Sequence, residues 1–161
     1  MRATFLLPNY LKVVGWLLFL TSTITYLYFT ISGESIDEYL LCKTFAIYQD
    51  GFFMVEKSNS FQFIENPMLD EILLVSFLLG ALILGFSKTK NEDEMVAKIR
   101  YESLVWATIF NIVMIIITTL TIYGMVFLNF IYFFIVSSLF FFVIRFHYQL
   151  YQLQKISEND E

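Results

Sequence analysis

The sequence predicts an all-α membrane protein: a bundle of four transmembrane helices, with a small external β-hairpin-like loop and a cytoplasmic amphipathic helix that leads into the third span. The 161 residues are 58% hydrophobic and 16% charged, with a mean hydropathy of +0.67. Soluble domains are nearer 45–50% apolar and about 25% charged. The charged residues are also clustered, which leaves uncharged stretches long enough to cross a bilayer. We expect one integral membrane domain over residues 1–161.

The first two spans are expected at residues 12–31 and 69–87. Lys12 is followed by 21 uncharged residues, and about 20 helical residues cross the hydrocarbon core. A cleaved signal peptide is the alternative for this segment, but its apolar run is too long and no A-x-A-like site follows it. Glu71 is followed by 16 uncharged residues, a short span that Lys88 can extend by snorkelling to the interface.

The third and fourth spans share the longest uncharged stretch, the 42 residues between Glu102 and Arg145. A single helix of that length would measure about 63 Å, about twice the thickness of the hydrocarbon core. The chain must therefore turn back, and the turn is expected from Tyr123-Gly124 to Asn129. This places the spans at 103–123 and 126–146, followed by a tail over 147–161.

The distribution of Lys and Arg predicts the orientation. Eight of these residues lie in the N-terminal segment, the loop at 88–102 and the C-terminal segment, whereas two lie in the loop at 32–68. The positive-inside rule then places both termini in the cytoplasm and the 32–68 loop outside. The net charge of −5 argues against direct nucleic-acid binding, which needs a basic face.

The external loop at 32–68 contains a hairpin signal. The segments TFAIYQ and FFMVEK favour β-structure and flank Asp50-Gly51, a dipeptide suited to a type I′ turn. The segment FQFI could add a third strand. Such a loop could recognise an external ligand, or it could simply shield the helix ends. Cys42 is expected to be a small buried hydrophobe.

The cytoplasmic loop at 88–102 is expected to form a helix that runs directly into the third span. Asn91 followed by Glu94 has the N-x-x-E pattern of a capping box. Lys98 is four residues from both Glu94 and Glu102, which allows two ion pairs along the helix surface.

This helix is the expected docking site for a cytoplasmic partner. Met95, Ile99 and Trp106 are expected on one apolar face. The alternative is a helix that lies among the lipid headgroups, anchored by its basic residues. The residues expected to dock the partner are Glu94, Lys98, Ile99, Arg100 and Glu102.

Polar residues inside the spans are expected to join the helices. Asn111 should form an interhelical hydrogen bond, and Ser76 with Gly80 forms a small-xxx-small step that permits close packing. No charged residue or His lies in the middle of a span, which argues against ion-coupled transport.

The leading hypothesis for function is a non-enzymatic interaction or regulatory protein. The alternative is a small homo-oligomeric transporter or channel subunit, because Asn111 and Thr118 lie on one helical face. The common hydrolase, metalloprotease and nucleotide-binding motifs are absent from the sequence. We therefore expect no catalytic residue, cofactor or metal ligand.

The block E-D-E-M-x-x-x-I-R-x-E-S-L-x-W-A at residues 92–107 and the closing RFHYQLY resemble a family of small four-span bacterial inner-membrane proteins of unknown function. The resemblance extends over most of the chain, although the external loop adds little to it. It implies a location in the bacterial inner membrane and no known activity or cofactor. By association it implies a helix-turn-helix regulator as the cytoplasmic partner.

Overall fold

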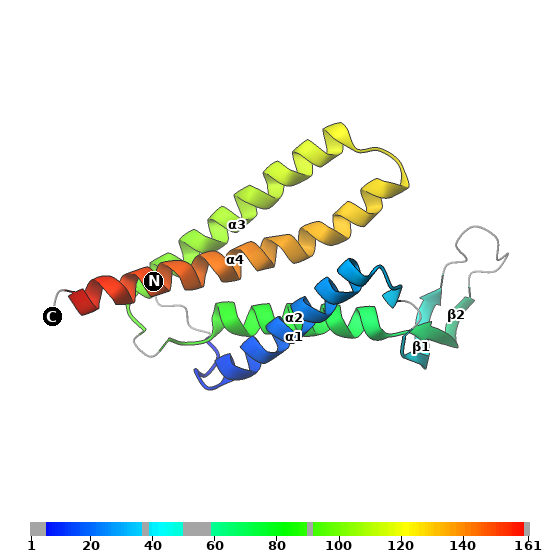
Figure 1. Ribbon diagram of the computed structural model, residues 1–161, viewed down its shortest axis with the longest axis horizontal. Coiled ribbons are helices and arrows are strands. Elements are labelled where there is room, and N and C mark those ends of the chain that lie inside the picture. Colours follow the sequence, from blue (N-terminus) through cyan, green and yellow to red (C-terminus); the bar gives the residue numbers. More distant parts are fainter. Residues whose placement is uncertain (1–5, 37–38, 50–58, 90–91, 160–161) are drawn as a thin grey trace. The chain divides into compact units, whose positions relative to one another are not determined.

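The computed structural model describes residues 6–36, 39–49, 59–89 and 92–159 (Figure 1). These ranges contain four helices and two strands, which are α1 (Leu11–Ser32), β1 (Leu41–Gln49), β2 (Asn59–Pro67), α2 (Leu69–Phe86), α3 (Glu94–Thr121) and α4 (Met125–Asn159). The chain divides into two compact units, and the division falls within α1 and α2. One unit holds the residues up to Thr21 and from Ser76 onward, and the other holds Ser22–Val75.

Each of the four helices contains a segment that is long and apolar enough to cross a membrane, as a multi-pass membrane protein requires. These segments are Leu11–Ser32, Leu69–Phe86, Glu94–Thr121 and Phe133–Ile156. α1 and α2 cover almost the residues expected for the first two spans. α3 joins the expected cytoplasmic helix to the third span without a break, and α4 continues beyond residue 146 to Asn159.

The turn between α3 and α4 is shorter than expected, because it takes only residues 122–124. The backbone N–H of Ile122 donates to the carbonyl oxygen of Thr118 at 2.8 Å and closes α3. Gly124 then adopts a φ of +81°, which glycine reaches without a steric penalty. The chain changes direction at this residue, and α4 begins at the next one, Met125.

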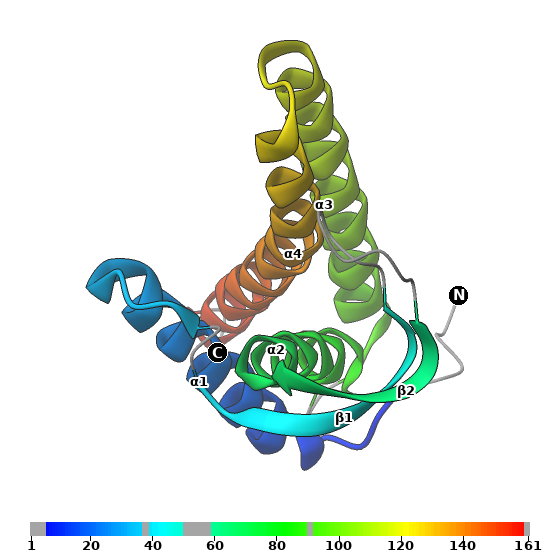
Figure 2. The same cartoon turned by 90° about the vertical axis from the view of Figure 1, so that its right-hand side faces the viewer.

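α3 and α4 lie side by side and antiparallel, and they approach each other toward the start of α3 (Figures 1 and 2). The residues that face inward on both helices are spaced alternately by three and four positions, as in a coiled-coil seam. They are Val96, Arg100, Ser103 and Ala107 on α3, and Leu139, Val143, Phe146, Leu150 and Leu153 on α4.

The inward face of α3 differs from the one expected. Met95 and Trp106 were expected on the apolar face, but each is 52% exposed, whereas Val96 and Ala107 are buried. The inward face differs because Arg100, a charged residue, lies in the core, where other residues of the chain bind its guanidinium. Hydrophobicity alone assigns such a residue to the surface.

Small residues bring the first part of α1 close to α2. A Cβ atom on Gly80 would lie 2.7 Å from the backbone nitrogen of Phe19 and 3.0 Å from the carbonyl oxygen of Gly15. Only glycine allows the two backbones to approach this closely. The ring of Phe19 then stacks on that of Phe77, with centroids 5.0 Å apart.

In the second unit, β1 and β2 form an antiparallel ribbon that bends strongly (Figure 2). The register runs from Leu41 opposite Pro67 to Gln49 opposite Asn59. The pairing of β1 was therefore predicted wrongly: its partner is the strand that contains FQFI. The expected Asp50-Gly51 turn and the segment FFMVEK fall in residues 50–58, outside the described residues.

The surface of this ribbon carries matched cross-strand pairs. Lys43 lies opposite Glu65, with 3.9 Å between Nζ and Oε1. Phe45 lies opposite Phe63, with ring centroids 5.5 Å apart. Such pairs stabilise a two-stranded ribbon. Cys42, expected to be buried, is exposed on β1, because a two-stranded ribbon leaves many of its side chains uncovered.

Candidate functional site: the polar cluster between α2 and α3

Backbone hydrogen bonds join the N-terminal segment to the end of α2. The N–H of Leu7 donates to the carbonyl oxygen of Phe86, and the N–H of Lys88 donates to the carbonyl oxygen of Leu7, both at 2.9 Å. Leu7 and Ser87 thus form a short parallel bridge. The three segments that meet here, before α1, after α2 and at the start of α3, are those expected on the cytoplasmic side.

A buried arginine closes this end of the helices. The Nη1 atom of Arg100 donates to Oε1 of Glu92 at 2.8 Å, and its Nη2 atom contacts the carbonyl oxygen of Ser87 at 3.3 Å. The guanidinium also lies over the ring of Phe146, 5.2 Å from its centroid. Glu92 accepts two further hydrogen bonds, from the backbone N–H and the hydroxyl of Thr89, at 2.8 and 2.9 Å. We call Ser87, Thr89, Glu92 and Arg100 the arginine clasp.

The clasp keeps Glu92 ionised. Burial by itself raises the pKa of this carboxyl, but the hydrogen bonds from Arg100 and Thr89 and the positive charge of Arg100 outweigh it, so its pKa lies below the usual value. Since an ionised carboxylate is the stronger acceptor, the ion pair and the Thr89 contacts support each other.

The helix begins at a different cap from the one predicted. The N-cap of α3 is Asp93, whose carboxylate accepts a hydrogen bond from the backbone N–H of Val96 at 2.8 Å. The expected cap, Asn91, lies outside the described residues. The N-x-x-E pattern of Asn91 and Glu94 predicted a cap two residues too early, because Asp93 supplies the capping carboxylate and Glu94 is the first residue of the helix.

The five expected docking residues divide between surface and core. Glu94 and Lys98 are exposed, and the carboxylate of Glu102 lies 3.9 Å from the Nζ atom of Lys98. Ile99 is half-buried against the core. Arg100 is 6% exposed and belongs to the clasp, so it is not part of an accessible docking face.

His147, on α4, packs against the start of α1. Its ring lies edge-to-face on Trp16, with centroids 5.0 Å apart. Its Nδ1 atom lies 2.9 Å from the carbonyl oxygen of Val143, and because a carbonyl only accepts, Nδ1 carries the proton. The i, i+4 spacing of His147 and Val143 was visible in the sequence, whereas the contact with Trp16 depends on the fold.

The polar residues expected to join the spans behave differently from one another. Gly80 makes the close backbone approach described above, and Ser76 is half-buried on α2. Asn111 is half-buried, and its buried Oδ1 atom has no hydrogen-bond partner among the described residues. The preceding residue, Phe110, stacks on Phe141 with centroids 4.8 Å apart, so an aromatic contact joins α3 and α4 at this level.

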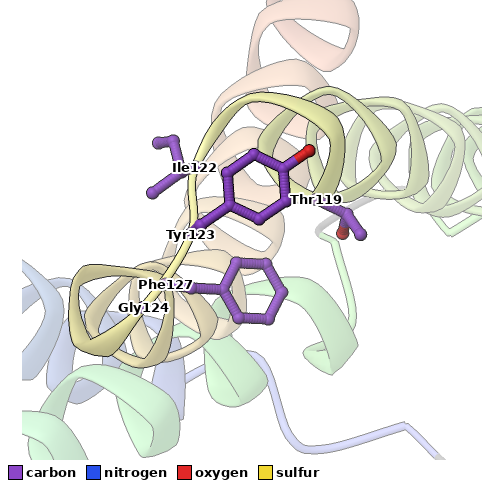
Figure 3. Close-up of a pocket in the computed structure, with 5 residues that line it drawn as sticks. All are labelled: Thr119, Ile122, Tyr123, Gly124 and Phe127. Carbon is purple, nitrogen blue, oxygen red and sulfur yellow. The ribbon is translucent and has the colours of Figure 1, made fainter.

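The hollows in the described part of the chain are shallow. One lies at the turn between α3 and α4 and is lined by Thr119, Ile122, Tyr123, Gly124 and Phe127 (Figure 3). Its lining is mainly apolar and offers no acid–base pair. Among the described residues, no three His, Cys, Asp or Glu side chains gather to hold a metal ion.

Comparisons with known proteins gave no match, whether with protein-family models, with curated proteins or with solved structures.

Proposed function

We propose that this chain is a bacterial inner-membrane protein with both termini in the cytoplasm, and that it acts without catalysis by docking a cytoplasmic partner on the first turns of α3. The observation that carries the proposal is the arginine clasp. It fixes the start of α3 against α2, α4 and the N-terminal segment, and it leaves one face of α3 exposed.

The docking face consists of Glu94, Lys98, Tyr101 and Glu102, which repeat at three and four residues along α3. Tyr101 is 69% exposed, and tyrosine is among the residues that contribute most to binding at protein interfaces. The face is held in place before any partner arrives, which reduces the entropy lost on association. By the resemblance described above, the partner is a helix-turn-helix regulator.

The proposed orientation rests on charge. The segments that meet at the clasp, together with the C-terminal segment, carry eight of the ten Lys and Arg residues. The positive-inside rule applies to short loops of this kind. The β1–β2 ribbon would then lie on the external side of the membrane.

A pull-down from native membranes with a C-terminal tag tests the docking face, and the chain supplies a matched control. Lys98 and Lys43 are both exposed, and each lies 3.9 Å from a glutamate oxygen. We expect Lys98→Glu to release a stoichiometric soluble partner, whereas Lys43→Glu, on the opposite side of the membrane, retains it. Both variants should insert normally. Equal retention by the two variants, or no partner in the wild type, contradicts the proposal.

A homo-oligomeric transporter or channel subunit is the second candidate. The exposure of α3 favours this candidate. Only 11% of the most apolar segment of α3 is buried within the chain, so most of this helix is open to lipid or to other copies. Recovery of the chain alone as a defined oligomer in mild detergent would support this candidate. It would count against the docking function.

A further inference from the structure

We propose that Arg145 and Trp106 form a binding site for the phosphate group of an acidic phospholipid. The guanidinium carbon of Arg145, on α4, lies 5.1 Å from the ring centroid of Trp106, on α3. This distance is within the range of a cation–π contact. This site requires insertion into a membrane but does not depend on the docking function.

The two side chains lie at the depth of the headgroups. The apolar segment of α4 extends to Ile156, but Arg145 is the first charged residue after 42 uncharged ones. A charged side chain at this point is stable where it reaches the headgroups. Trp106 is 52% exposed on the facing helix, and tryptophan is enriched at this level of the bilayer.

The guanidinium of Arg145 has no anion within the described part of the chain. It forms no ion pair or hydrogen bond there, and its Nε atom is buried without an acceptor. Glu102, one helical turn before Trp106, is paired with Lys98 instead. The outer N–H groups of a guanidinium match phosphate oxygens in a bidentate geometry.

Arg100 has an anionic partner, and Arg145 has none among the described residues. Both arginines lie over an aromatic ring, at 5.2 Å and 5.1 Å from the centroid. Arg100 has the carboxylate of Glu92 at 2.8 Å, whereas Arg145 has no such group among the described residues. At the membrane surface the missing anion is available as a lipid phosphate. An acidic lipid fits better than a zwitterionic one, because no residue in the described ranges compensates the charge of Arg145.

Lipid titration of the full chain in neutral detergent tests the site. The chain contains two tryptophans, so Trp16→Phe leaves Trp106 as the only indole reporter. Its fluorescence is followed as short-chain phosphatidylglycerol, phosphatidylcholine or inorganic phosphate is added. One basic residue near a membrane surface contributes about a fivefold preference for acidic lipid, and we expect about that ratio of phosphatidylglycerol to phosphatidylcholine affinity.

Variants complete the experiment. Arg145→Gln should abolish the lipid preference, and Arg145→Lys, which retains the charge but not the bidentate geometry, should reduce it. Lys155→Gln, a matched loss of charge further along α4, should leave it unchanged. Equal affinities for the two lipids, a preference that survives Arg145→Gln, or binding of inorganic phosphate as tight as that of phosphatidylglycerol would overturn the proposal. If Arg145→Gln fails to fold, Arg145→Lys and the wild-type lipid comparison still decide it.

Discussion

The arginine clasp predicts strong non-additivity between Glu92 and Arg100. Glu92→Gln removes the carboxylate and leaves the guanidinium of Arg100 without its counter-charge, with 7% of its side chain exposed. Breaking a fully buried pair costs about 3–5 kcal/mol. Because the Glu92 side chain is 24% exposed, water offsets part of this cost, and we expect a loss of about 2–3 kcal/mol in the free energy of unfolding.

Arg100→Met should cost less. It removes the ion pair and the contact with the Phe146 ring, but it places an apolar side chain in an apolar seam and leaves no buried cation. Glu92 keeps its hydrogen bonds from Thr89 and can reach water. We expect a loss of about 1–2 kcal/mol. The double variant should lose about the same amount, because it also contains no unpaired buried charge.

The coupling energy between the two positions is therefore about 2–3 kcal/mol, since the separate losses exceed the combined loss by the cost of Glu92→Gln. It can be measured by unfolding the purified protein with SDS in mixed micelles, with circular dichroism to follow helicity. The exposed pair Lys98–Glu102, at 3.9 Å, is the control and should couple by less than about 0.5 kcal/mol. Losses that add within about 0.5 kcal/mol would refute the description of the clasp.

Three further predictions concern the pKa of Glu92, the close helix approach at Gly80 and the buried side chain of Asn111. The folded-state pKa of Glu92 is lowered from 4.5, so the ionised carboxylate stabilises the fold. The loss of stability caused by Glu92→Gln should therefore be present at neutral pH and disappear as the pH falls below 4.5. Parallel SDS titrations of the two proteins measure this difference, and a pH-independent difference would contradict the prediction. Gly80→Val should cost about 1–3 kcal/mol because its Cβ meets the backbone of Phe19, whereas the exposed Leu82→Ala should change stability little. Asn111→Leu should be neutral or stabilising, because it removes a buried oxygen that has no partner in the described part of the chain; a lower stability together with a lost oligomer would instead favour the channel candidate.

The sequence predicts the helices well because the number of residues between charged positions gives the length of each apolar stretch. Lys12, Glu71, Glu102 and Arg145 bound stretches whose lengths allow only a few spans. The continuous path from the cytoplasmic helix into the third span was also predictable, since no glycine or proline interrupts residues 94–121.

The details of the site were not predictable, because they depend on contacts between distant segments. Arg100 was expected on the docking surface, and its burial requires Glu92 and Phe146 to converge on it from the loop before α3 and from α4. The strand partner of β1 was misassigned because local β-propensity marks strands but not their pairing. The pairing of Arg145 with Trp106 likewise depends on the register of two antiparallel helices.

Labelling of Cys42 tests the orientation on which the proposed function depends. This is the single cysteine of the chain, and it is exposed on β1. A membrane-impermeant maleimide can be applied to right-side-out and to inverted vesicles of the bacterial inner membrane. In a Cys42→Ser background, Lys155→Cys places the same reporter on the α4 end of the chain.

We expect Cys42 to react in right-side-out vesicles and the reporter at position 155 to react only in inverted ones. Labelling of Cys42 only in inverted vesicles, or labelling of both reporters from one side, would contradict it. The docking face of α3 would then not lie in the cytoplasm.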